Sequence, residues 1–116
     1  MYQFSYAEVT QDSSATARDR EREALDRMLD ALRRAEAAGT RSREAVEAIY
    51  LTRNLWALLV EDLANPENAL PEELRAGLIS IGLWIMREAE ALRLGQRDSF
   101  AAMIEITTMI RDGLGD

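Results

Sequence analysis

Cysteine, histidine and lysine are all missing from this chain, because its 14 basic residues are all arginine. Their absence excludes a histidine general base, a cysteine nucleophile, a Schiff-base lysine and a thiolate metal site. Carboxylates and hydroxyls remain, but no pattern arranges them as a catalytic or metal site. We therefore expect a protein that is not an enzyme and holds no cofactor. No disulfide can form, which agrees with a reducing compartment such as the cytoplasm.

An excess of basic charge and a long apolar run are missing as well. The formal net charge is -7, which argues against binding to nucleic-acid phosphates or to an anionic membrane surface. The longest apolar run, 76–86, lies between Arg75 and Arg87 and is far shorter than the ~18 residues that a membrane span needs. No basic segment followed by an apolar run marks a signal peptide. We expect a cytoplasmic protein without direct nucleic-acid or membrane contacts.

Proline and glycine are scarce, with 2 and 6 copies in 116 residues, and they lie mostly at segment ends, which is typical of long helices. The length suits one domain. Apolar residues at helical spacing predict four helices, over 17–38, 43–64, 70–94 and 99–112. Ser42 and Asp98 are placed to cap the second and the fourth helix, and Gly39 and Gly95 to end the first and the third. The predicted fold is all-α, an antiparallel bundle of about four helices with short loops.

The N-terminus carries three aromatic residues at alternate positions, Tyr2, Phe4 and Tyr6. They would share one side of an extended segment. We expect a short aromatic arm and polar linker over 1–16 and a helical bundle domain over 17–116. The arm either packs into a groove of its own domain or seals against a partner, and the sequence leaves both options open.

The stretch 70–94 is apolar on nearly all sides, which predicts a central helix with neighbours on several sides. Gly77 and Gly82 lie inside it, where each costs about 1 kcal/mol relative to alanine. They indicate either a close crossing with another helix or a groove kept open for a partner. The preceding segment 65–71, NPENALP, predicts a helix hairpin and is also a candidate for a second partner contact.

Two charged residues, Arg53 and Glu88, fall within apolar helix faces, and a charge in a core needs a partner. They either pair with each other, or Arg53 extends its charged end to solvent. Helical spacing places seven residues of the second helix on the same apolar face as Arg53: Val46, Ile49, Tyr50, Trp56, Ala57, Val60 and Leu63.

The second, third and fourth helices carry more apolar residues than one stripe per helix requires. The surplus consists of Leu51, Leu55, Leu58 and Leu59 in the second helix, Ile79, Leu83 and Met86 in the third, and Ile106 and Met109 in the fourth. An exposed apolar patch usually marks an interface. Three explanations compete: a bundle that wraps a buried third helix, a homodimer that covers the patch, and a partner's amphipathic helix that docks on it.

Four segments of the chain resemble the FlaF family of flagellar biosynthesis regulators. They are MYQFSYAEV at the N-terminus, REREALDRML at 20–29, the continuous stretch 42–92, and FAAMIEITTMIRDGL at 100–114. The resemblance implies a small cytoplasmic helical protein of flagellated bacteria. It further implies a link to flagellin, in its secretion, in filament assembly, and in the control of its production together with the regulator FlbT.

The resemblance and the apolar surplus together predict a regulator that binds flagellin non-catalytically, as an export chaperone or assembly factor. Six of the surplus residues are the candidate contacts with flagellin's amphipathic terminal segments: Leu51, Leu55, Leu58, Leu59, Leu83 and Met86. Tyr2, Phe4 and Tyr6 are candidates for closing the groove. FlbT is a further candidate partner, and the unbound protein is expected as a monomer or homodimer. Two alternatives remain: a translational regulator of flagellin that acts with FlbT, and a self-associating structural protein.

Overall fold

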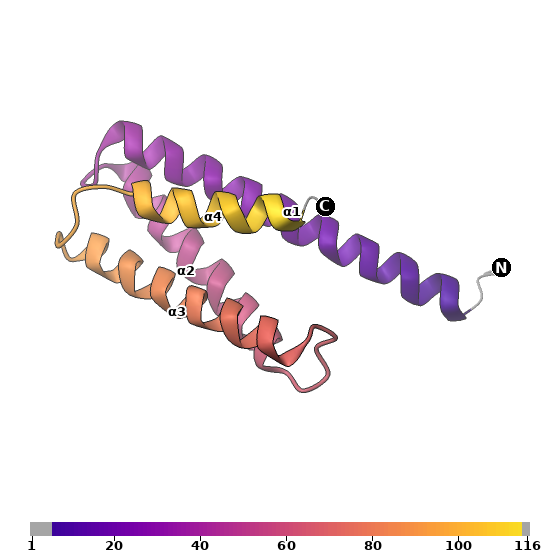
Figure 1. Ribbon diagram of the computed structural model, residues 1–116. Coiled ribbons are helices and arrows are strands. Elements are labelled where there is room, and N and C mark those ends of the chain that lie inside the picture. Colours follow the sequence, from indigo (N-terminus) through magenta and orange to yellow (C-terminus); the bar gives the residue numbers. More distant parts are fainter. Residues whose placement is uncertain (1–5, 115–116) are drawn as a thin grey trace.

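The computed structural model describes the backbone of residues 6–114 and the side chains of residues 19–113. It contains four helices, α1 (Tyr6–Ala38), α2 (Arg43–Ala64), α3 (Glu72–Arg93) and α4 (Ala101–Leu114), which alternate in direction (Figure 1). No strand occurs in this part of the chain. The all-α prediction of about four antiparallel helices is therefore confirmed.

The short connections follow from the residues at the helix ends. The Ser42 hydroxyl accepts a hydrogen bond from the Ala45 N–H at 3.0 Å, as the predicted N-cap of α2 should. Gly39 and Gly95 both have positive φ, 107° and 76°, so they can follow α1 and α3 in the left-handed conformation that favours glycine. At Gly95 the chain makes a Schellman turn, in which the Gln96 N–H donates to the Ala91 carbonyl at 2.8 Å.

The start of α4 differs from the prediction that Asp98 caps it. The Ser99 hydroxyl accepts from the Ala101 N–H at 3.0 Å, and Glu36 of α1 accepts from the Phe100 N–H at 2.9 Å and from the Ser99 hydroxyl at 2.6 Å. A carboxylate from another helix therefore satisfies the free donors at this terminus. Sequence spacing cannot reveal a cap that comes from so far along the chain.

The start of α1 also differs, because the helix begins at Tyr6 and not near residue 17. The segment 11–16, predicted as a linker, is thus helical backbone. Tyr2 and Phe4 and the side chain of Tyr6 lie outside the described residues, as does the predicted aromatic arm. The division into an arm over 1–16 and a domain over 17–116 stays a prediction.

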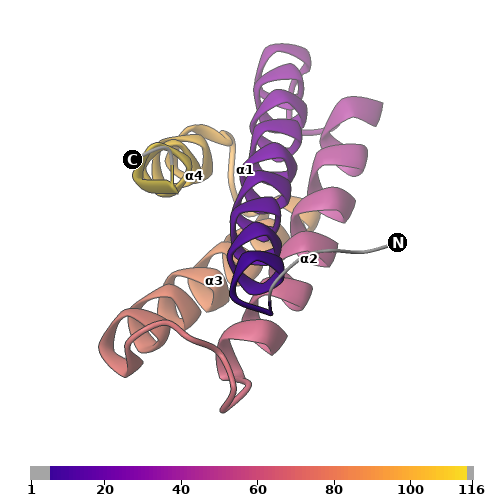
Figure 2. The same cartoon turned by 90° about the vertical axis from the view of Figure 1, so that its right-hand side faces the viewer.

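The helices pack as three pairs, α1 with α2, α2 with α3, and α1 with α4. In Figure 2, α4 and α2 lie on opposite sides of α1. No extensive contact joins α3 to α4 within residues 6–114, so the bundle does not close into a ring. The prediction that 70–94 forms the central helix is wrong, because the backbone of α3 closely approaches that of α2 alone, and only its C-terminal half reaches the core shared with α1 and α4. Part of the apolar surface of α3 is exposed, at Leu74 and Leu83.

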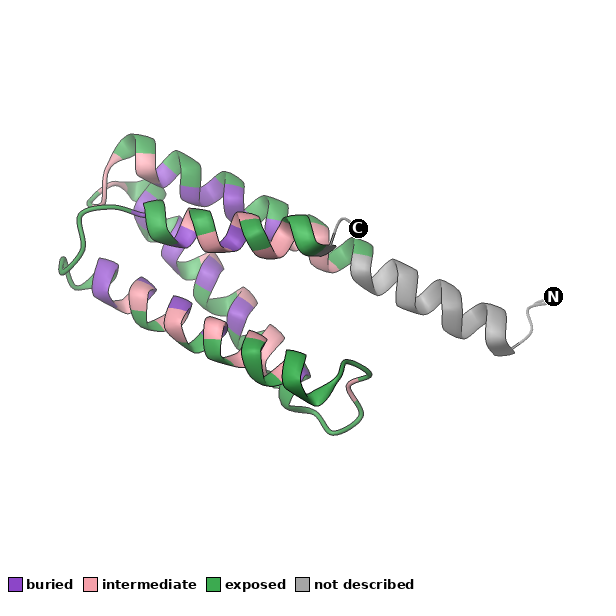
Figure 3. Ribbon diagram, viewed as in Figure 1, coloured by how far each residue is buried: buried purple, intermediate pink, exposed green. Residues whose placement is uncertain are grey.

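The hydrophobic core lies where α1, α2, the C-terminal half of α3 and the first turns of α4 meet (Figure 3). Its largest fully buried side chains are Trp56, Phe100, Leu25, Met28, Leu32, Ile85 and Met103. Figure 3 also shows that the N-terminal end of α3 is mostly exposed. Within residues 6–114, none of the helices is long and apolar enough to cross a bilayer.

The two glycines of α3 have different surroundings. A Cβ atom on Gly82 would lie 2.6 Å from Trp56 Cε3 and 2.9 Å from Val60 Cγ2, whereas one on Gly77 would have nothing within 4 Å. The close-crossing interpretation is therefore right for Gly82, where α2 approaches α3. It does not hold for Gly77, which faces open space.

Candidate partner-binding surface

The six predicted contact residues do not share one exposed face. Leu58 on α2 is 66% exposed and Leu83 on α3 is 45% exposed. The other four, Leu51, Leu55, Leu59 and Met86, are half-buried and pack against the core. The surplus is smaller than the sequence predicts because α2 packs against both α1 and α3, and a helix with two neighbours needs a wider apolar stripe.

An opening lies between the N-terminal half of α2 and the C-terminal end of α3. We call this the α2–α3 groove, and its volume is about 820 Å³. Its lining consists of Thr40, Arg41, Val46, Ile49, Tyr50, Arg53, Asn54, Ala57, Met86, Leu92, Arg93, Leu94 and Gly95. Of the six predicted contact residues, only Met86 is part of this lining. The structure therefore places five of the six predicted residues outside this groove.

Sequence reasoning missed the exposed side chains of this groove. Helical spacing groups Val46 and Tyr50 with the buried Ile49 and Trp56, yet Tyr50 is 70% exposed and Val46 is similarly exposed. The signal that could have found them is the position of Arg53, three residues after Tyr50 and within the same apolar face. A charged residue there indicates that this side of α2 reaches solvent.

Arginine side chains and one glutamate determine the charge around the groove. Glu90 Oε2 lies 3.4 Å from Arg53 Nη1 and 2.9 Å from Arg93 Nε. The hydrogen bond from Arg93, helped by the charges of Arg93 and Arg53, holds the pKa of Glu90 below its usual value, and the same bond raises the pKa of Arg93. The carboxylate thus joins α2 to α3 at this end.

The predicted pairing of Arg53 with Glu88 is wrong, whereas the alternative that Arg53 extends to solvent is confirmed, because Arg53 is exposed. Arg53 pairs with Glu90, and Glu88 pairs with Arg97 in the loop after α3, with Nε to Oε1 at 3.1 Å. The antiparallel register brings Glu90, two residues further along α3, opposite Arg53. A local charge count cannot fix that register, so the sequence identified the residue that needs a partner and not the partner itself.

A model of the FlaF family, described as flagellar protein FlaF, matches residues 2–114, which is nearly the whole chain. The chain belongs to the FlaF family. The resemblance seen in the sequence is thereby confirmed, and the protein is a flagellar one. No curated protein and no solved structure matches the chain.

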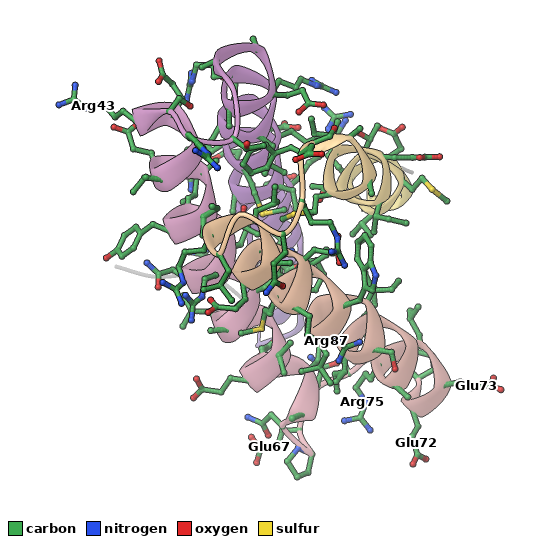
Figure 4. The ribbon with its side chains drawn as sticks, turned by 90° about the vertical axis from the view of Figure 1, so that its left-hand side faces the viewer. Arg43, Glu67, Glu72, Glu73, Arg75 and Arg87 are labelled. Carbon is green, nitrogen blue, oxygen red and sulfur yellow. The ribbon has the colours of Figure 1, made fainter. Side chains whose placement is uncertain are left out.

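The hairpin between α2 and α3 of this FlaF-family chain is held by its own polar groups. Asn65 Oδ1 accepts from the Glu67 N–H at 2.9 Å, and Asn68 Nδ2 donates to the Asp62 carbonyl at 3.2 Å. Arg75 Nη1 donates to the Asn65 carbonyl at 3.2 Å. These bonds support the plain hairpin interpretation of 65–71. Figure 4 shows Glu67, Glu72 and Glu73 together at this end with Arg75, and Arg43 at the opposite end.

A smaller opening between α1 and α4, of about 380 Å³, contains an ion pair. Arg111 Nε of α4 lies 2.6 Å from Asp26 Oδ1 of α1, and this hydrogen bond lowers the pKa of Asp26 below its usual value. Because the pair joins two helices of the FlaF-family chain, its role is structural. Among the described residues, no group of three or more acidic side chains is arranged to hold a metal ion.

Proposed function

We propose that this flagellar protein binds flagellin non-catalytically, as an export chaperone or assembly factor in the cytoplasm, and so helps to control flagellin synthesis and secretion. The observation that carries the proposal is the apolar surface of α2 and α3 that no other part of the described chain covers, with Leu58 66% exposed and Leu83 45% exposed. Exposed apolar surface on a small helical protein is suited to an amphipathic segment of a partner.

The proposed contacts combine exposed and half-buried residues. Leu58 and Leu83 reach solvent, whereas Leu51, Leu55, Leu59 and Met86 are half-buried and packed against the core, so they would contact a partner only at their edges. Tyr2, Phe4 and Tyr6 are proposed to close over the bound segment. Flagellin's terminal segments fit this surface because they are amphipathic and unfolded before export.

Co-purification with flagellin tests the proposal. Leu58→Asp and Leu83→Asp place a charge on exposed positions, so the variants should fold, which circular dichroism checks. We expect both to capture less flagellin than wild type. Met109→Asp is the matched control, because Met109 is an exposed apolar residue of α4, and α4 packs on α1 and has no extensive contact with α2 or α3.

Two results would contradict the proposal at different levels. If wild type captures no flagellin, the chaperone role is wrong. If folded Leu58→Asp and Leu83→Asp capture as much flagellin as Met109→Asp, the role stands and the surface is wrong. Leu55 and Leu59 are poorer choices for such variants because both pack against the core, where a buried unpaired charge unfolds the protein.

The same exposed apolar residues favour a second candidate, self-association into a homodimer that covers them. Sedimentation at low micromolar concentration distinguishes a monomer with an open surface from a dimer. A role in flagellin translation, through FlbT or directly on messenger RNA, is the remaining candidate. Direct RNA binding predicts a steep loss of affinity with salt, and the net charge of -7 opposes it.

A further inference from the structure

We propose that the α2–α3 groove binds an acidic, amphipathic helical segment of a partner protein. Three arginines, Arg41, Arg53 and Arg93, belong to its lining, and none of the described residues that line it is acidic. The groove lining is therefore positively charged, although the net charge of the whole chain is -7. The proposal goes beyond flagellin binding because it specifies the chemistry of the segment and not the protein that supplies it.

The positive charge of the groove is only partly neutralised. Glu90 lies beside Arg53 and Arg93, so the local group consists of three guanidinium groups and one carboxylate. Arg41 is exposed in the connection between α1 and α2, which borders the groove. Each guanidinium has five N–H donors, and Glu90 uses few of them. The free donors suit carboxylates, which arginine binds in a bidentate geometry.

The apolar part of the groove indicates a polypeptide and not a small molecule. Val46 and Tyr50 on α2 and Leu94 after α3 are all exposed, so the groove is open along its side. A small ligand normally buries most of its surface in its site, which an open groove cannot provide. An amphipathic helix buries one apolar stripe in such a groove through residues at i, i+3, i+4 and i+7, and its flanking carboxylates would then lie beside the arginines.

Two synthetic helical peptides with the same leucine stripe test the proposal, one with glutamates and the other with lysines beside the stripe. The overall charge of -7 favours the lysine peptide, so a preference for the glutamate peptide reports the groove. We expect the full-length chain to bind the glutamate peptide about tenfold more tightly. Fluorescence anisotropy measures both dissociation constants, and the preference should shrink as salt is raised.

Variants then assign the binding to the groove. We expect Arg41→Gln and Arg53→Gln each to weaken binding of the glutamate peptide about threefold, and Tyr50→Ala to weaken it about fivefold or more. Arg87→Gln is the matched control, because Arg87 is exposed on α3 and outside the groove lining (Figure 4); it should bind as wild type does. Circular dichroism checks that each variant is folded.

Three results would overturn the proposal. The first is tighter binding of the lysine peptide, and the second is glutamate-peptide binding that the groove variants leave unchanged. The third is a wild-type dimer in sedimentation that Tyr50→Ala and Arg53→Gln both dissociate, because a second copy would then be the occupant. Since neither peptide comes from flagellin, these results are independent of the flagellin capture experiment.

Discussion

The two aromatic residues of α2 lie in opposite surroundings, although α2 and α3 contact each other at both places. Trp56 is 1% exposed and packs against Gly82 in the middle of the helix pair, whereas Tyr50 is 70% exposed beside the groove at its end. In the middle, a missing side chain on α3 allows close approach. At the end, Arg53, Arg93 and Glu90 connect the helices through longer polar side chains. The difference indicates that close packing of side chains stabilises the middle of the α2–α3 pair, whereas at its end the helices leave an open groove.

The largest difference in the free energy of unfolding should be the one between the two variants that each lack one aromatic ring of α2. Trp56→Ala would empty a fully buried site, and we expect it to lower the free energy of unfolding by about 3–5 kcal/mol. Tyr50→Ala removes an exposed ring, and we expect a change of only about 0.5 kcal/mol. Urea unfolding followed by far-ultraviolet circular dichroism measures both. A Tyr50→Ala loss as large as that of Trp56→Ala would show that the groove residue belongs to the core.

The two glycines of α3 sharpen the comparison, because the same substitution should have opposite effects. Gly77→Ala meets nothing within 4 Å, so the better helix former should raise the free energy of unfolding by about 1 kcal/mol. Gly82→Ala gains the same propensity but drives a methyl group into the rigid Trp56 ring, at a cost of about 1–3 kcal/mol. We expect a net loss of about 1 kcal/mol. Equal stabilisation by both variants in urea unfolding would disprove the close crossing.

The sequence predicts the fold well where the causes are local. The N-cap at Ser42, the glycines that end α1 and α3, and the hairpin at 65–71 all depend on residues a few positions apart. The cap of α4 by Glu36 and the outer position of α3 were missed, because both depend on which helices meet. Apolar residues on all sides of a helix predict burial only when neighbouring helices exist to cover them. No extensive contact between α3 and α4 covers the side of α3 that faces away from α2.

The candidate site was harder to predict for the same reason. The sequence predicts surplus leucines on α2, but Leu51, Leu55 and Leu59 are half-buried and pack against the core. Helical spacing groups the exposed Tyr50 with the buried Ile49 and Trp56, because it fixes a side chain's direction and not what lies opposite it. The arginines of the groove come from three separate segments, and only the fold brings them together.

The smallest expected effect on stability concerns the polar end of the α2–α3 helix pair, where Glu90→Gln removes the carboxylate between Arg53 and Arg93. Because the hydrogen bond from Arg93 lowers the pKa of Glu90, this group stabilises the fold at pH values above its ordinary pKa of about 4.3. That contribution is lost as the pH falls through its lowered native pKa. Glu90→Gln should therefore be slightly less stable than wild type at pH 7, and the difference should vanish in strong acid and at high salt.

Glu47→Gln is the control, because Glu47 is an exposed glutamate of α2. Urea midpoints of both variants across pH measure the effect, and a Glu90→Gln deficit that persists unchanged below pH ~3 would mean that lost packing, and not lost charge, causes it.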